Sequence, residues 1–175
     1  MKNQLFQLSI RTSDGQFIAR YSTKGLAELS FPSRKALVAP KRGEGGPVTL
    51  EHGKGIPATI LRSHRKTVTA LKSALAGRAA KNLPPLDLSA GTEFQKKVWS
   101  ALRKISAGKT KSYGEIAQAI GKPKAVRAVG GACGANPIPI FVPCHRVLAA
   151  NQKLGGFSGG LDWKRSLLAR EGVKM

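Results

Sequence analysis

The sequence predicts two domains: an α/β N-terminal domain, a small β-sheet plus a helix, over residues 1–85, and a mostly helical C-terminal domain with a helix-turn-helix over residues 86–175. Apolar residues alternate along residues 4–31, as they do in strands, and then recur at helical spacing over residues 59–80. A proline-rich link at residues 82–88 follows, and beyond it capping signals and helical spacing dominate. This change of pattern places the domain boundary.

The N-terminal sheet is expected to contain three strands. Residues 5–10 and 17–21 flank the turn sequence SDGQ at residues 13–16, which suits a hairpin. A third alternating run at residues 25–31 ends at Pro32, which cannot donate to a strand ladder.

A basic segment and one helix complete this domain. Residues 33–57 are rich in Lys, Arg, Gly and Pro without periodicity, so they predict a loop that either faces phosphates or is simply solvated. Ile60 and Leu71 share the apolar face of the helix predicted over residues 59–80, which Gly77 ends or weakens.

The first helix of the C-terminal domain carries a clear capping signal. Thr92 and Gln95 form a capping box, in which each side chain can bond the other residue's backbone N–H. The apolar face continues to Ile105, so the helix is expected to close at Gly108, with Trp99 packed in the core.

Residues 112–134 are predicted to form two short helices joined by a tight turn. Ser112 caps the first helix, Gly121 ends it, and Pro123 suits the first turn of the second. This is a helix-turn-helix pattern, which is weak by itself and is strengthened by the charge of the chain.

The charge points to a polyanionic partner. Lys and Arg total 30 against 9 acidic residues, for a formal net charge of +21. Nucleic acid is the first candidate because neutralising phosphates releases counterions. No membrane partner is expected, since no basic amphipathic helix, spanning run or signal peptide is evident. Two cysteines do not form a disulfide framework, and they suit a reducing, cytoplasmic location.

The second helix of the pair has an unusual face. Arg127 projects from the side opposite to the predicted core, together with three glycines. Each interior glycine costs a helix about 1 kcal/mol relative to alanine. Either a DNA groove approaches this face closely or another part of the protein packs tightly against it. The glycines are Gly130, Gly131 and Gly134, and the core face contains Ala125, Val129 and Ala132, with Ala128 and Cys133 at its edges.

Cys144 follows a proline-punctuated apolar run. Residues 136–147 contain three prolines, which favour an edge strand or an extended segment. A neighbouring base or cation promotes the nucleophilic thiolate, and His145 and Arg146 follow directly. A buried structural cysteine is the alternative, because neighbours on an extended chain face opposite ways and His145 would need a turn or a water to act. The cysteines and histidines lack zinc spacing, so no metal is expected.

The end of the chain is predicted to be a flexible loop and a last helix. Four glycines surround Phe157 and Ser158, so this loop could wrap or admit a flat ligand. Asp162 is expected to cap a helix over residues 163–171. Glu171 opposes the dipole of that helix, which suggests a specific partner, either His145 or an arginine.

The motif PCHRV at residues 143–147, with RAVGGA at residues 127–132 and Asn136-Pro137, strongly resembles the O6-alkylguanine-DNA alkyltransferases, the methylated-DNA–protein-cysteine methyltransferases. The resemblance runs from about Thr92 to Gly172. It implies a suicide repair protein that binds duplex DNA, flips an alkylated guanine and moves the alkyl group irreversibly onto Cys144, without a cofactor.

The resemblance also implies residue roles. His145 would act through a water as the base for Cys144, Glu171 would orient the imidazole, and Asn136 would bond across the turn. Arg127 would take the place of the flipped base in the minor groove, and Arg146 would be structural. A monomer in solution is expected, and cooperative binding on DNA stays open. The other implied substrate contacts are the Tyr113 hydroxyl, the Val147 backbone and Ser158, and the other implied DNA contacts are Ala125, Ala128, Gly130 and Gly131.

Three rival functions fit parts of the sequence. A helix-turn-helix regulator explains the charge but not the pair Cys144-His145. A sensor of alkylated guanine with this fold would lack the cysteine. A cysteine hydrolase would leave the charge of +21 without a reason.

Overall fold

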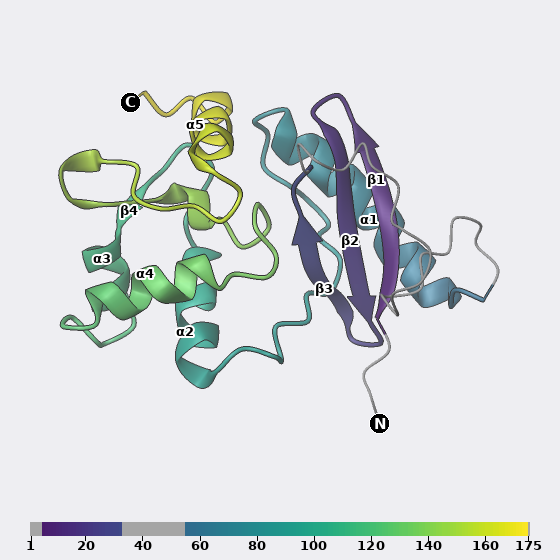
Figure 1. The fold of residues 1–175 in the computed structure, drawn as a ribbon, viewed down its shortest axis with the longest axis horizontal. Coiled ribbons are helices and arrows are strands. Elements are labelled where there is room, and N and C mark those ends of the chain that lie inside the picture. Colours follow the sequence, from purple (N-terminus) through teal and green to yellow (C-terminus); the bar gives the residue numbers. More distant parts are fainter. Residues whose placement is uncertain (1–4, 33–54, 175) are drawn as a thin grey trace, which may run out of the picture.

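The computed structural model describes residues 5–32 and 55–174. Most of the predicted basic loop at residues 33–57 therefore lies outside the described residues. Within these ranges the chain forms a small sheet with one helix, followed by a mostly helical half, as the sequence predicts (Figure 1). None of the helices in the described part is long and apolar enough to cross a membrane.

The N-terminal half is an antiparallel sheet with one helix packed on it. The strands are β1 (Phe6–Thr12), β2 (Gly15–Ser22) and β3 (Gly25–Ser30), in that order across the sheet. The predicted hairpin is confirmed, with Thr12 opposite Gly15 and two residues between them. The inward side chains of the sheet and of α1 (Ala58–Leu75) form one core: Ile10, Phe17, Ala19, Tyr21, Leu26, Ile60 and Leu71.

Helix α1 ends just before the glycine that the sequence marked, Gly77, and does not continue to residue 80. The helix stops at Leu75, and Gly77 adopts a left-handed φ of +72° just beyond it. A β-carbon on Gly77 would lie 1.9 Å from the carbonyl oxygen of Arg170, so only glycine fits this close approach. The turn that ends α1 is thus pressed against the end of the last helix.

The C-terminal half contains four helices and short connecting elements. Its α3–α4 pair is the predicted helix-turn-helix, and a short parallel pairing of β4 with β5 connects the start of α3 to the segment after Cys144. The elements are α2 (Glu93–Leu102), β4 (Lys111–Ser112), α3 (Tyr113–Ala119), α4 (Val126–Gly134), the 3-10 helix η1 (Cys144–Arg146), β5 (Val147–Leu148), the 3-10 helix η2 (Ala150–Gln152) and α5 (Leu161–Arg170).

The predicted caps of α2 and α3 are confirmed, but the end of α2 is not. Thr92 forms the capping box of α2, and Ser112 forms another with Glu115 on α3. Helix α2 ends at Leu102 instead of continuing to Gly108. The chain leaves the helix there, and the carbonyl of Ile105 is turned toward Arg146, whose Nη1 donates to it at 2.6 Å.

Two further expectations about the C-terminal half are wrong. Asp162 does not cap α5: the helix begins at Leu161 after Gly160, whose φ is +90°, and Asp162 lies in its first turn. The segment before Cys144 is not an extended strand, because it folds back on itself with a bridge between Pro139 and Val142. The Asn136 side chain stabilises this reversal, because its Oδ1 accepts from Ile138 N–H and its Nδ2 donates to the Val142 carbonyl.

The free edge of β3 joins the two halves. Leu26 N–H donates to the Pro85 carbonyl at 2.8 Å, and Asp87 N–H donates to the Leu26 carbonyl at 2.7 Å. Further along the same strand, Leu29 N–H donates to the Pro137 carbonyl at 2.9 Å. The link and the segment before Cys144 therefore both bond to the N-terminal sheet. The domain boundary at residues 85 and 86 stays a prediction.

Candidate active site

Cys144 is the first residue of η1 and is buried, with 3% of its surface exposed. Its sulfur accepts a hydrogen bond from Asn136 Nδ2 at 3.0 Å. Burial raises the pKa of the Cys144 thiol, whereas the Asn136 hydrogen bond and the positive charge of Lys164 act in the opposite direction. The resting thiol is therefore protonated at neutral pH, and a nearby base is needed to make it a nucleophile.

Asn136 is held in one orientation by three hydrogen bonds. Its Oδ1 accepts from Ile138 N–H at 3.0 Å, which leaves Nδ2 to donate to the Val142 carbonyl at 2.7 Å and to the Cys144 sulfur. The expected hydrogen bond across the turn is thus present. An N–H donor aimed at the sulfur stabilises the thiolate over the thiol.

His145 is almost fully buried, at 1% exposure, and its two ring nitrogens have different environments. Nε2 lies 2.9 Å from Glu171 Oε1, so the proton is assigned to Nε2. Nδ1 is buried without a hydrogen-bond partner among the described residues. Burial lowers the pKa of His145 despite the opposing effect of Glu171, which keeps the ring neutral and Nδ1 free to accept a proton.

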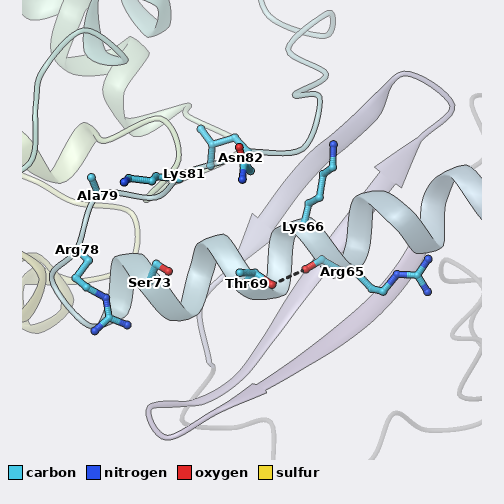
Figure 2. A pocket seen from close by; sticks show the side chains of 9 residues that line it. Arg65, Lys66, Thr69, Ser73, Arg78, Ala79, Lys81 and Asn82 are labelled. Carbon is cyan, nitrogen blue, oxygen red and sulfur yellow. Dashed lines mark hydrogen bonds between the residues drawn. The ribbon is translucent and has the colours of Figure 1, made fainter.

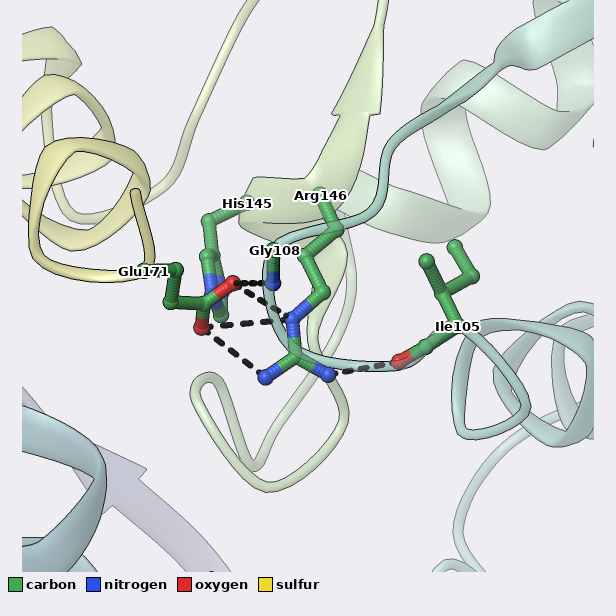
Figure 3. A network of polar contacts seen from close by, with 5 residues as sticks. All are labelled: Ile105, Gly108, His145, Arg146 and Glu171. Carbon is green, nitrogen blue, oxygen red and sulfur yellow. Dashed lines mark hydrogen bonds and ion pairs between the residues drawn. The ribbon is translucent and has the colours of Figure 1, made fainter. Parts of the chain in front are cut away.

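Glu171 is the C-cap residue of α5 and the centre of a buried polar network (Figure 3). Arg146 grips the carboxylate with Nε at 2.9 Å from Oε2 and Nη2 at 2.8 Å from Oε1, and Gly108 N–H donates to Oε2 at 3.2 Å. Burial alone would raise the pKa of Glu171, but the hydrogen bonds from His145 and Arg146 hold it at about 2. Both partners predicted for Glu171, the histidine and an arginine, are present.

Lys164 is a site residue that the sequence analysis missed. It is completely buried on α5, and its Nζ donates to the Val147 carbonyl at 2.7 Å and to the carbonyls of Leu154 and Gly156. Burial lowers the pKa of Lys164, and its charge favours the Cys144 thiolate. Lys164 precedes the buried Leu167 and Leu168 by three and four residues, a spacing that puts all three on one face of α5. This spacing could have identified Lys164 from the sequence.

The three predicted substrate contacts lie in different settings. Tyr113 is half-buried at the start of α3, and a β-carbon on Gly155 would lie 3.0 Å from its hydroxyl oxygen, so the tyrosine faces the glycine loop. Burial, and then proximity to Cys133 and Cys144, raises the pKa of Tyr113. Val147 is buried and its carbonyl already accepts from Lys164.

Ser158 is exposed in a turn of the glycine loop. It lines a hollow of about 480 Å³ together with Asn136, Pro139 and Phe31, whereas Cys144 and Tyr113 are not among the residues that line this hollow. The structure therefore brings Ser158 near Asn136 but does not place it in one cavity with the thiol.

The glycine face of α4 is open. Arg127, Ala128 and Gly131 are exposed, and Ala125 is half-buried as the N-cap. β-Carbons on Gly131 and Gly134 would meet nothing within 4 Å, and one on Gly130 would meet only the Tyr113 ring at 4.0 Å. Tight packing against another described part of the protein therefore does not explain these glycines. The opposite side of the helix carries the predicted core residues Val129 and Ala132.

The site thus combines a buried cysteine with an adjacent histidine–glutamate pair, in the same half of the chain as the helix-turn-helix. A family model described as the DNA-binding domain of 6-O-methylguanine DNA methyltransferase matches residues 93–173. A methylated-DNA–protein-cysteine methyltransferase of Mycobacterium bovis is 53% identical over 144 residues, covering 72% of this chain and 86% of that protein. The chain belongs to this family.

Other relatives extend the comparison. A methylated-DNA–protein-cysteine methyltransferase of Methanosarcina acetivorans is 62% identical over 82 residues, 47% of this chain, and this match spans about half of that protein's length (53%). The crystal structure of Mycobacterium tuberculosis OGT in complex with DNA superimposes with a TM-score of 0.68 and 37% identity, over 93% of this chain and 90% of that chain. The two-part fold predicted from the sequence is confirmed.

Proposed function

We propose that this protein repairs O6-alkylguanine in duplex DNA by moving the alkyl group onto Cys144, once per molecule and without a cofactor. The observation that carries the proposal is the arrangement around the buried thiol: an amide donor on the sulfur, a neutral histidine with a free nitrogen, and a carboxylate fixing that histidine. The names of the relatives and the structure of the M. tuberculosis protein with DNA support the same reaction and partner.

In the proposed reaction, His145 Nδ1 takes the proton of the Cys144 thiol through an intervening water. Glu171 holds the imidazole in the required tautomer and stabilises the imidazolium that forms. Asn136 Nδ2 and the charge of Lys164 stabilise the thiolate. The sulfur then bonds the alkyl carbon while the bond from that carbon to O6 breaks and its electron pair stays on the guanine, toward which the Tyr113 hydroxyl can donate.

The product explains the single turnover. A thioether on Cys144 is not a leaving group under these conditions, so the acceptor is consumed. The proposal requires a reducing compartment, because oxidation of either free cysteine would compete with the transfer. The cytoplasm meets this requirement. We propose that the protein acts as a monomer.

DNA binding is assigned to α3 and α4, with the open face of α4 toward the minor groove. The minor groove is only about 6 Å wide, so a helix with several glycines on one face can approach its walls most closely. Arg127 is exposed on this helix and can fill the space of a flipped guanine, and Ala125, Ala128, Gly130 and Gly131 supply the close contacts. Ser158 and the Val147 backbone remain proposed contacts of the base.

The test is intact-protein mass spectrometry after mixing the protein with excess duplex DNA that contains O6-methylguanine. We expect one added methyl group that maps to Cys144 and is absent in Cys144→Ser. Cys133→Ser is the matched control: burial raises the pKa of this second thiol to about 12, so it should remain protonated and the control should still be methylated.

Two outcomes would contradict the proposal in different ways. Tight and selective binding of the lesion without a change of mass would indicate a damage sensor. Binding without selectivity and without a change of mass would indicate a helix-turn-helix protein that only binds DNA.

A further inference from the structure

A large basic hollow lies on the N-terminal half, away from the thiol site. It has a volume of about 1000 Å³ and is formed by the outer side of α1 and the turn that follows this helix. Figure 2 shows Lys66 extending to the side on which Lys81 and Asn82 lie, while Thr69 and Ser73 line the helix surface between the charged groups. The lining contains four cations and no carboxylate.

The four cations of the hollow have no acidic partner in the part of the chain that the structure describes. Arg65, Lys66, Arg78 and Lys81 are exposed, and none takes part in an ion pair within the part of the chain that the structure describes. By contrast, cations on other surfaces, such as Arg20 and Lys111, do face carboxylates. Four cations beside hydroxyl groups form a surface that attracts the charged oxygens of phosphate groups.

The hollow is built on fixed backbone. The turn carrying Arg78 begins at Gly77, which is pressed against the Arg170 carbonyl, and Arg170 Nη1 donates to the Leu75 carbonyl at 2.8 Å. Arg78 N–H also donates to the Ser73 carbonyl at 3.0 Å. The backbone of this turn is therefore fixed against the end of α1 before any ligand binds, so binding does not have to order it, which lowers the entropic cost.

We propose that this hollow binds the phosphate backbone of a second DNA segment while α3 and α4 hold the first. Figure 1 shows α1 in the half of the molecule that carries the sheet and the helix-turn-helix in the other half, so the hollow and the α3–α4 pair are separate surfaces. The inference rests on the proposed function only for the first duplex. Phosphate contacts carry no sequence information, so the second site takes any duplex and is strongly salt-dependent.

The test counts duplexes per protein by sedimentation at low salt, with a short fluorescent duplex in excess. We expect two duplexes for the wild type and one for the variant Arg65→Gln/Lys66→Gln/Arg78→Gln/Lys81→Gln. The matched control changes two arginines and two lysines that are exposed and do not line the hollow, and it should still bind two. Its substitutions are Arg11→Gln, Arg103→Gln, Lys104→Gln and Lys174→Gln.

The salt dependence gives a second measurement. Removing up to four phosphate contacts should lower the slope of log K against log salt for the second duplex by about 3 to 4 and weaken its binding by more than about tenfold. One duplex on the wild type, two on the hollow variant, or equal losses in variant and control would each overturn the proposal. Preference of the hollow for single-stranded RNA over duplex DNA would also overturn it.

Methyl transfer separates this inference from the proposed function. The hollow variant should still acquire one methyl group on Cys144, because the substituted residues are remote from the thiol. If the wild type failed to accept a methyl group yet bound two duplexes, the reaction would be wrong and the second DNA site would stand. Circular dichroism of the variant checks its folding, and the double variant Arg78→Gln/Lys81→Gln should show a smaller loss in the same direction.

Discussion

Two consecutive residues at the end of α5, Arg170 and Glu171, each form a carboxylate–guanidinium pair. Arg170 reaches back to Asp14 in the β1–β2 turn, with Nη2 at 2.6 Å from Oδ1. Glu171 turns the other way and binds Arg146 and His145. The first pair is partly exposed, with 32% and 19% of its side chains accessible, whereas Glu171 is 7% exposed.

The difference shows how burial changes the value of the same chemical pair. Water screens the Arg170–Asp14 pair, so it contributes little to stability and mainly positions α5 against the first hairpin. The Glu171 carboxylate is largely removed from water and is solvated mainly by its protein donors. Removing one member there leaves a buried charge without a partner.

The largest effect is expected for Glu171→Gln. Glutamine has no charge to balance Arg146, and it replaces one of the two acceptor oxygens by an NH2 group that cannot accept from Arg146 or His145, so the free energy of unfolding should fall by about 3–5 kcal/mol. Urea denaturation measures the fall, and single-turnover methyl transfer should slow as well. Asp14→Asn is the matched control, since it makes the same chemical change in the exposed pair.

The contribution of Glu171 to stability should be lost in acid. The pKa of Glu171 is about 2 in the folded protein and about 4.5 as its ordinary value, so its contribution is complete above pH 4.5 and is lost as the pH falls toward 2. The contribution amounts to about 3 kcal/mol, from about 1.36 kcal/mol per unit. The difference in unfolding free energy between wild type and Glu171→Gln should therefore shrink across this window. If the difference in unfolding free energy stayed constant between pH 4.5 and pH 2, the assigned role of the Glu171 carboxylate would be wrong.

The smallest effect is expected for Asp14→Asn. The hydrogen bond from Arg170 lowers the pKa of Asp14, but the pair is accessible to solvent, so the loss should be below about 1 kcal/mol and smaller still at high salt. Thermal unfolding at low and high salt measures it. A loss as large as that of Glu171→Gln would mean that burial does not separate the two pairs.

Local rules predicted the elements whose sequence signals are local. The caps at Thr92 and Ser112 and the hairpin at residues 13–16 follow from residues within one turn of each other, and all three are confirmed. Gly77 was also a local signal, since the sequence marked it as the residue that ends or weakens α1, and α1 does stop at Leu75 just before it. The end of α2 could not be found in this way, because the chain beyond Leu102 turns the Ile105 carbonyl toward a distant partner, the Arg146 guanidinium.

In the candidate site, too, some residues carried a signal in the sequence and others did not. Family motifs pointed to Cys144, His145 and Asn136, and the misfit of Glu171 on its helix pointed to its partners. The reversal of the chain before Cys144 was missed because prolines are common to extended segments and to tight loops. Lys164 was missed because a lysine is rarely buried without a carboxylate, and here three carbonyls replace one.

The hydrogen bonds along the free edge of β3 have a consequence for folding. Leu29 N–H bonds to the Pro137 carbonyl, more than one hundred residues further along the chain, so the N-terminal half cannot protect this amide alone. The hydrogen exchange of Leu29 should require global opening and should be as slow as that of the innermost amides of β2. The strand also loses its exposed edge, which in an isolated N-terminal fragment would be free to pair with other chains. The two halves are thus expected to unfold as one cooperative unit, although the sequence patterns predict two domains.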